Sequence, residues 1–212
     1  MSQDLTGVAA WAVRVMEALG GPGAALVVAL ENVFPPIPSE VVLPLAGFTA
    51  SQGTFTVLGA ILWTTAGSVA GALLLYGLGR WFGARRVRAV AARIPLVDAR
   101  DIDRAEEWFQ RHGRSAVFFG RMLPVVRSAI SVPAGAEAMP VVPFTLLTLA
   151  GSGIWNGVFV VAGYLLGENW SAVSPYAEVL QWVVVAALVA LVVWFVVVRL
   201  RRRRSHGGIV DG

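Results

Sequence analysis

Long apolar runs alternate with polar or interrupted stretches along this chain, and the runs differ in length. Residues 55–79 and 143–167 are apolar for long enough to cross a bilayer, which takes about 20 helical residues. Residues 179–198 form a third run of this kind. The runs at 24–30 and 41–50 are too short, since seven residues reach only about 10 Å at 1.5 Å per residue. The pattern predicts three membrane-spanning helices and several shorter apolar elements.

The first short pair of runs, residues 24–50, combines apolar residues with two carboxylates, Glu31 and Glu40. Four prolines interrupt it, namely Pro35, Pro36, Pro38 and Pro44. Proline removes a helical hydrogen bond, and hydrocarbon offers no other partner for the freed backbone group. We therefore expect a broken helical hairpin buried in protein, and a carboxylate at membrane depth is a functional-site hypothesis.

A second apolar segment, residues 115–135, is also interrupted by prolines, but its charged residues are positive instead of negative. Arg121 and Arg127 lie among apolar residues, and Pro124 and Pro133 break the run. We expect a second hairpin here.

The distribution of arginine predicts the topology. Residues 80–114 hold nine arginines and residues 199–212 hold five, which is fourteen of the seventeen basic residues. The positive-inside rule places both regions in the cytoplasm, the first as a loop with a surface helix and the second as a basic tail. The segment 115–135 must then enter and leave the membrane on the cytoplasmic side, as a re-entrant hairpin.

The N-terminal residues 1–23 are expected to form an interfacial helix, because residues 5–19 place their apolar side chains on one helical face. They lack the basic start and long apolar run of a cleaved signal peptide.

The two halves of the chain resemble each other weakly. Pro44, Ala46, Gly47 and Phe55 correspond to Pro133, Ala134, Gly135 and Phe144, and LLLYGLGRW corresponds to VAGYLLGENW. Each half reads as a surface helix, a broken hairpin and a glycine-rich span, and the two spans run in opposite directions. This predicts an inverted-topology repeat that brings Glu31 and Glu40 towards the two arginines. The alternative is one broken span at 24–50, which would put the N-terminus inside.

Composition, net charge and the absence of cysteine narrow the class of protein. The chain is 57% hydrophobic and only 14% charged, against about 25% in soluble proteins, which indicates an integral membrane protein with one membrane domain. Its net charge of +4 has a topological meaning, so we expect no nucleic-acid binding. There is no cysteine, and the two histidines, His112 and His206, have no acidic cluster beside them. We expect no metal site and no cofactor.

Two interpretations of the four buried charges remain open. Glu31, Glu40, Arg121 and Arg127 pair across the hairpins and only hold them together, or the arginines bind a phosphate group while the glutamates carry a proton or gate the site. Two GxxxG pairs, Gly67 with Gly71 and Gly153 with Gly157, are expected to pack helices closely.

Three motifs together resemble the DedA family of bacterial membrane proteins, whose core domain is shared with eukaryotic lipid scramblases. They are ENVFPPIPSEVVLPLAG, YGLGRWFG and FFGRMLPVVRSAISVPAG, and the resemblance covers residues 24–170. It implies two opposed re-entrant hairpins in an inverted repeat. It also implies that the essential acids of the family fall on Glu31 and Glu40, and its essential arginines on Arg121 and Arg127. The second acid is often aspartate in that family and is glutamate here.

The resulting hypothesis is an all-α polytopic transporter or flippase in the bacterial cytoplasmic membrane, with a cytoplasmic C-terminus. Its substrate is expected to be an anionic lipid head group, undecaprenyl phosphate first of all, with proton coupling and a homo-oligomer left open. The alternatives are an uncoupled phospholipid scramblase, a proton or ion antiporter, and a scaffold without transport. An enzyme is not expected, because no positioned nucleophile and base is visible.

Overall fold

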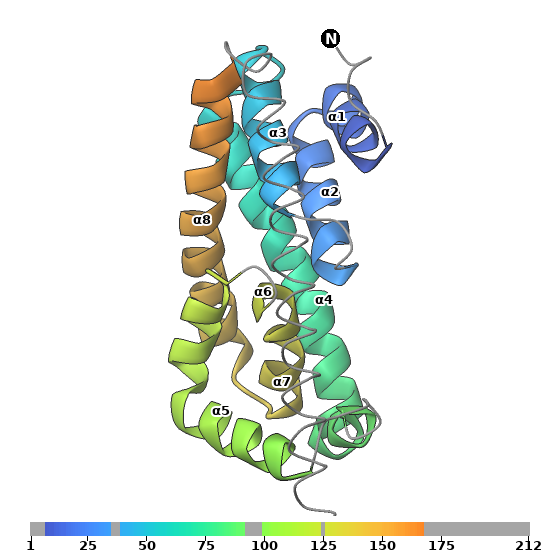
Figure 1. Cartoon of the computed structure of the whole chain (residues 1–212), viewed down its shortest axis with the longest axis vertical. Coiled ribbons are helices and arrows are strands. Elements are labelled where there is room, and N and C mark those ends of the chain that lie inside the picture. Colours follow the sequence, from blue (N-terminus) through green and yellow to red (C-terminus); the bar gives the residue numbers. More distant parts are fainter. Residues whose placement is uncertain (1–6, 35–38, 92–98, 124–125, 168–212) are drawn as a thin grey trace, which may run out of the picture.

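In the described part of the chain, two long helices, α4 (Val57–Ala91) and α8 (Val141–Leu166), run along the molecule (Figure 1). Four of the six shorter helices, α2, α3, α5 and α7, pack against them. The computed structural model describes residues 7–34, 39–91, 99–123 and 126–167. These residues contain no strand, so the prediction of an all-helical chain is confirmed for them. The expected span 179–198 and tail 199–212 lie outside the described residues.

The first half of the chain forms α1 (Gly7–Leu19), α2 (Gly21–Val33) and α3 (Ser39–Ser51) before α4. Gly20 has a φ of 63°, which lets the chain turn between α1 and α2. The helix α2 continues past Leu30 and includes Glu31. Pro44 does not break the chain as expected, because it lies inside α3. It removes only one ladder bond there, and packing against α8 is kept.

The second half forms α5 (Ala99–Gly120), α6 (Val126–Ala129) and α7 (Ser131–Ala136) before α8. The interruption lies between Gly120 and Val126. Pro133 differs from its predicted role as a break, because it occupies the first turn of α7, where a missing N–H needs no partner. The helix α4 also extends past residue 79 and bends at Gly83, whose φ of 71° suits glycine.

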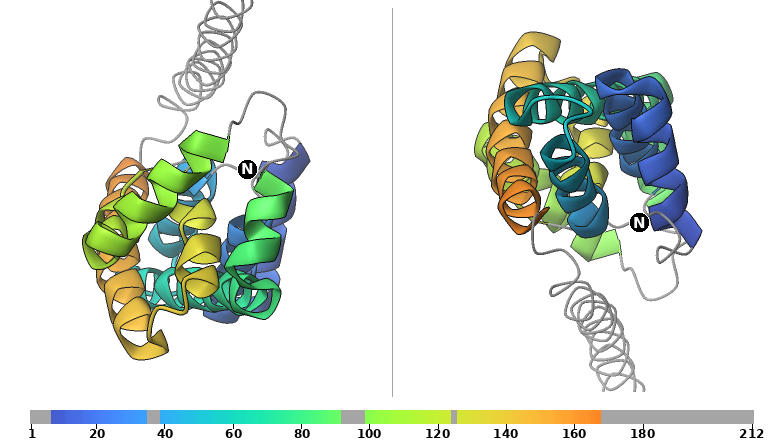
Figure 2. Two further views of the ribbon diagram at one scale, coloured as in Figure 1. Left: turned by 90° about the horizontal axis from the view of Figure 1, so that it is seen from below. Right: turned by 90° about the horizontal axis from the view of Figure 1, so that it is seen from above.

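The short helices of each half pack on the long helix of the other half as well as on their own. Both α2 and α7 pack on α4, and α3 and α5 pack on α8. Seen from above, α3 lies between α8 and the pair α1–α2, and seen from below, α7 lies between α8 and the end of α4 (Figure 2).

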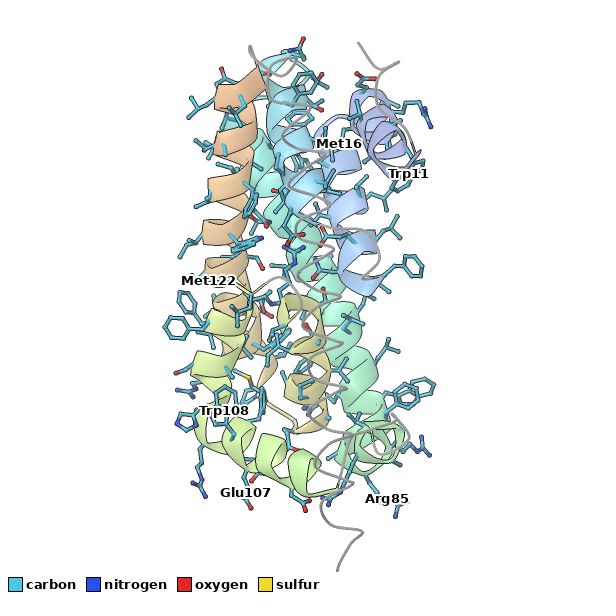
Figure 3. All side chains as sticks on the ribbon, viewed as in Figure 1. Trp11, Met16, Arg85, Glu107, Trp108 and Met122 are labelled. Atoms are coloured by element: carbon cyan, nitrogen blue, oxygen red, sulfur yellow. The ribbon has the colours of Figure 1, made fainter. Side chains whose placement is uncertain are left out.

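Two buried apolar clusters fill the interior. The upper cluster joins α1 to α4 with α8 and consists of Ala12, Met16, Ala24, Val27, Val28, Val42, Leu43, Ala46, Ala50, Ala60 and Val160. The lower cluster joins α4, α5, α7 and α8 and consists of Ala72, Tyr76, Phe109, Ala116, Val117, Ile130, Ala134 and Phe144. Met16 lies near the end of the molecule opposite to Glu107 and Arg85 (Figure 3).

The outer faces of the long helices are also apolar. Val57–Ala89 and Val141–Leu166 are long and apolar enough to cross a membrane. Their exposed side chains include Leu58, Leu62, Leu74, Leu146, Ile154 and Leu165. In water this surface would be unfavourable, whereas hydrocarbon accommodates it.

Candidate functional site

A buried ion pair joins the two halves of the molecule. Glu31 lies in the last turn of α2, and Arg127 lies in α6. The Arg127 Nη2 atom donates to Glu31 Oε1, and each side chain is only 4% exposed. The sequence predicted that glutamates of the first segment approach arginines of the second, and the structure brings this pair together.

Arg121 lies beside this pair and has a different environment. Arg121 is the first residue after α5, and it is 1% exposed. Nη2 donates to Ser131 Oγ at 2.7 Å, and Nη1 lies 3.4 Å from Asn32 Oδ1. Its guanidinium carbon is 5.9 Å from the centre of the Phe144 ring, within cation–π distance. Among the described residues, Nε has no acceptor. The hydrogen-bonding partners of this buried cation are thus neutral groups.

The formal charge of the three residues follows directly. Two guanidinium groups and one carboxylate leave +1 among Glu31, Arg121 and Arg127. A buried cation is unfavourable unless it is paired, so this arrangement favours an additional anion. A guanidinium presents five N–H donors in a plane, which suits the oxygens of a phosphate.

The remaining predicted site residues are Glu40 and the prolines. Glu40 lies half-buried in the first turn of α3. Four of the prolines predicted to break the hairpins lie outside the described residues, namely Pro35, Pro36, Pro38 and Pro124. Polar side-chain atoms gather midway along the bundle, at the level where Met122 is marked (Figure 3).

Three polar residues of the site were missed by the sequence reasoning. Asn32 accepts from Arg121 and also from Ser128 Oγ, at 3.4 Å, and it donates to the Val28 carbonyl at 3.1 Å. Ser131 accepts from Arg121. Their position is the one signal in the sequence, because Asn32 directly follows Glu31 and both serines lie within the second interrupted segment, residues 115–135.

The glycine pairs differ in their surroundings. A Cβ at Gly67 or Gly71 would meet the α2 backbone at Ala25 or Ala29. No described atom lies within 4 Å of a Cβ at Gly157, and only one atom, in Thr65, does so at Gly153. The close approaches of α8 occur instead at Gly151, next to Arg121, and at Gly163, next to the Pro44 backbone.

No metal-binding group was found among the described residues, in which no three histidine or acidic side chains gather in a suitable way. His112 is exposed and stacks on Trp108, with 5.5 Å between the ring centres. His206 lies outside the described residues.

Comparison with known proteins gives a family match and several relatives. The VTT domain model matches residues 37–165. An alkaline phosphatase-like protein of Lactococcus lactis subsp. cremoris is 42% identical over 83% of this chain and 84% of its own. Undecaprenyl phosphate transporter A of Bacillus subtilis is 36% identical over 76% of this chain and 81% of its own, and its namesake in Staphylococcus aureus is 30% identical over 84% and 90%. No solved structure matches.

Proposed function

Since this chain belongs to the family of VTT-domain membrane proteins, also called DedA, we propose that it is a transporter that flips an anionic lipid head group between the leaflets of the cytoplasmic membrane. The first candidate substrate is undecaprenyl phosphate, which two relatives carry in their names. Only the head group needs a polar path, because the polyprenyl tail can remain in the bilayer.

The observation that carries this proposal is the environment of Arg121. A guanidinium that is 1% exposed and hydrogen-bonded to Ser131 and Asn32 has spare donor capacity and uncompensated charge. A phosphate oxygen would supply both the missing acceptor and the missing negative charge.

The pairing of Arg127 with Glu31 suggests how binding would be coupled to protons. If a phosphate draws Arg127 away, the buried Glu31 carboxylate loses this cation and takes up a proton. When the phosphate leaves, the proton is released and the ion pair reforms. Each cycle then moves one proton with one head group, and Glu40 is a further acid that carries a proton or gates the site.

Two re-entrant hairpins in an inverted repeat are the second part of the proposal, and the glycine contacts support it. A Cβ at Gly47 of α3 would meet Val160 O and Tyr164 N of α8, and a Cβ at Gly135 of α7 would meet Tyr76 O and Arg80 N of α4. In both cases the long helix offers the carbonyl of one residue and the N–H of the fourth residue after it. Matching contacts between opposite halves are expected from an inverted repeat.

The test is a head-group accessibility assay in proteoliposomes that contain undecaprenyl phosphate, with and without a proton gradient. We expect flipping by the wild type, and its loss in Arg121→Gln and Arg127→Gln variants that remain folded. Arg111→Gln is the matched control, because that side chain is exposed and its pair with Glu107 is a surface contact at 3.9 Å. If the wild type flips no undecaprenyl phosphate under either condition, undecaprenyl phosphate is excluded as the substrate.

The same vesicles separate the rival functions. Flipping that ignores both the gradient and Glu31→Gln indicates a phospholipid scramblase. Ion flux without lipid movement indicates an antiporter. Release of inorganic phosphate from the lipid would indicate the enzymatic activity suggested by the name of the Lactococcus relatives.

A further inference from the structure

A stripe of buried polar residues leads away from Arg121 along the interface of α4 and α8. Thr148, Ser152 and Asn156 follow one another at intervals of one turn on α8 and are 1%, 4% and 0% exposed. Thr65 and Ser68 of α4, at 7% and 1%, lie opposite Asn156. Phe144 and Gly151, both close to Arg121, lie on the same face of α8 as Thr148.

The hydrogen bonds within this stripe are incomplete. Asn156 Nδ2 donates to Ser68 Oγ at 3.1 Å and lies 3.5 Å from Thr65 Oγ1, but its Oδ1 has no donor among the described residues. The Thr148 hydroxyl likewise has no partner among them. Leaving a buried polar group unsatisfied costs about 1–3 kcal/mol, so buried groups of this kind are normally completed by ordered water.

Thr148 differs from three other threonines in these helices. Thr49, Thr64 and Thr145 each bond the carbonyl four residues earlier, at 2.7–2.8 Å. The Thr148 hydroxyl does not, so its hydrogen-bonding capacity is available to the interface. Arg121 Nε, at the beginning of the stripe, also lacks an acceptor among the described residues.

We propose that this stripe binds a file of buried water molecules that runs from Arg121 to Asn156. Four helical residues rise about 6 Å, which is close to the length of two hydrogen bonds of about 2.8 Å through one water. A water between successive polar side chains therefore completes both of them. At the Arg121 end, the file solvates the guanidinium on the side that Ser131 and Asn32 do not reach.

The file is closed at its other end. The residue one turn beyond Asn156 is Val160, which is 0% exposed and belongs to the upper cluster. Water can thus solvate Arg121 without forming a continuous path along the molecule. The water file itself does not depend on the proposed function. Its role of solvating Arg121 while this residue exchanges its partners for a phosphate does rest on that function.

X-ray radiolytic labelling of the full-length protein in nanodiscs tests this inference. Radiolysis makes hydroxyl radicals from trapped water itself, so side chains beside buried water are oxidised although bulk solvent does not reach them. Phe144 and Val160 bracket the stripe and are both 0% exposed. Val27 is the control, because it is 0% exposed and lies on α2, which contributes no residue to the stripe.

We expect Phe144 and Val160 to be labelled severalfold faster than Val27, with each rate divided by that of the same residue in the unfolded protein. Thr148→Val should lower both rates, whereas Thr64→Val should leave them unchanged. Equal rates for Phe144, Val160 and Val27 in the wild type would overturn the inference, as would a Thr148→Val variant that melts at a higher temperature, since that indicates a dry hydroxyl. If Phe144 and Val160 are labelled rapidly in a wild type that flips no lipid, the water file stands and the proposed function is wrong.

Discussion

Replacing Glu31 by glutamine should destabilise the protein far more than breaking an exposed ion pair of the same chain. The change removes the carboxylate that faces Arg127 and keeps the shape of the side chain. It raises the formal charge of the buried trio from +1 to +2, because Arg121 and Arg127 both remain. The comparison is the pair Arg88–Asp103, which links α4 and α5 at the surface.

The burial of the two pairs sets the expected magnitudes. The side chains of Glu31 and Arg127 are both 4% exposed, so removal of one partner should cost about 3–5 kcal/mol. The side chains of Arg88 and Asp103 are 42% and 47% exposed, and Asp103→Asn should therefore cost about 0–1 kcal/mol. Arg127→Gln should cost less than Glu31→Gln, because it lowers the formal charge of the buried trio from +1 to zero, whereas Glu31→Gln raises it to +2.

Unfolding of the purified protein by SDS, followed through its eight tryptophans, gives the free energies. A double variant, Glu31→Met with Arg127→Met, should lose less stability than Glu31→Gln, because it keeps the formal charge of the buried group at +1 instead of raising it to +2. If Glu31→Gln proves no more costly than Asp103→Asn, the carboxylate does not compensate the buried arginines, and the charge balance proposed for the site is wrong.

Three further predictions concern the helices around the site. Gly135→Ala should destabilise the protein by at least about 1–3 kcal/mol, because the added Cβ meets the α4 backbone at Tyr76. Gly77→Ala should stabilise it by about 0.5–1 kcal/mol, because no described atom lies within 4 Å of a Cβ there, and SDS unfolding of both variants measures the difference. Tyr76→Phe removes the hydrogen bond from the hydroxyl to Met139 O, at 2.5 Å, and should cost about 0.5–1.5 kcal/mol by the same measurement. Gly83→Ala should cost about 1–3 kcal/mol, because φ of 71° with ψ of 163° suits only glycine, and an unchanged melting temperature would show that the bend in α4 is not required.

The sequence predicted the parts of the fold that depend on apolar pattern and charge. The run at 55–79 and the run at 143–167 both belong to long helices, and the approach of Glu31 to Arg127 followed from placing charge inside apolar segments. Pro44 and Pro133 were less informative, because a helix continues through a proline when few backbone bonds depend on it.

The neutral partners of the site were beyond this reasoning. Asn32 and Ser131 have no pattern of their own, and their importance arises only when Arg121 is placed between them from another part of the chain. The hydroxyl of Thr148 illustrates the same point, because only the structure distinguishes it from Thr64, which bonds its own helix.

The two apolar clusters have an electrical consequence for the charged layer between them. With the long axis across the bilayer, each apolar cluster is an insulating layer. Moving one elementary charge across the full thickness against a membrane potential of about 100 mV costs about 2.3 kcal/mol. When both clusters are dry, the voltage drop is shared between them. When one cluster admits water, the whole drop falls across the other. The membrane voltage would then act on the step at which a cluster opens, rather than on the contact between arginine and head group.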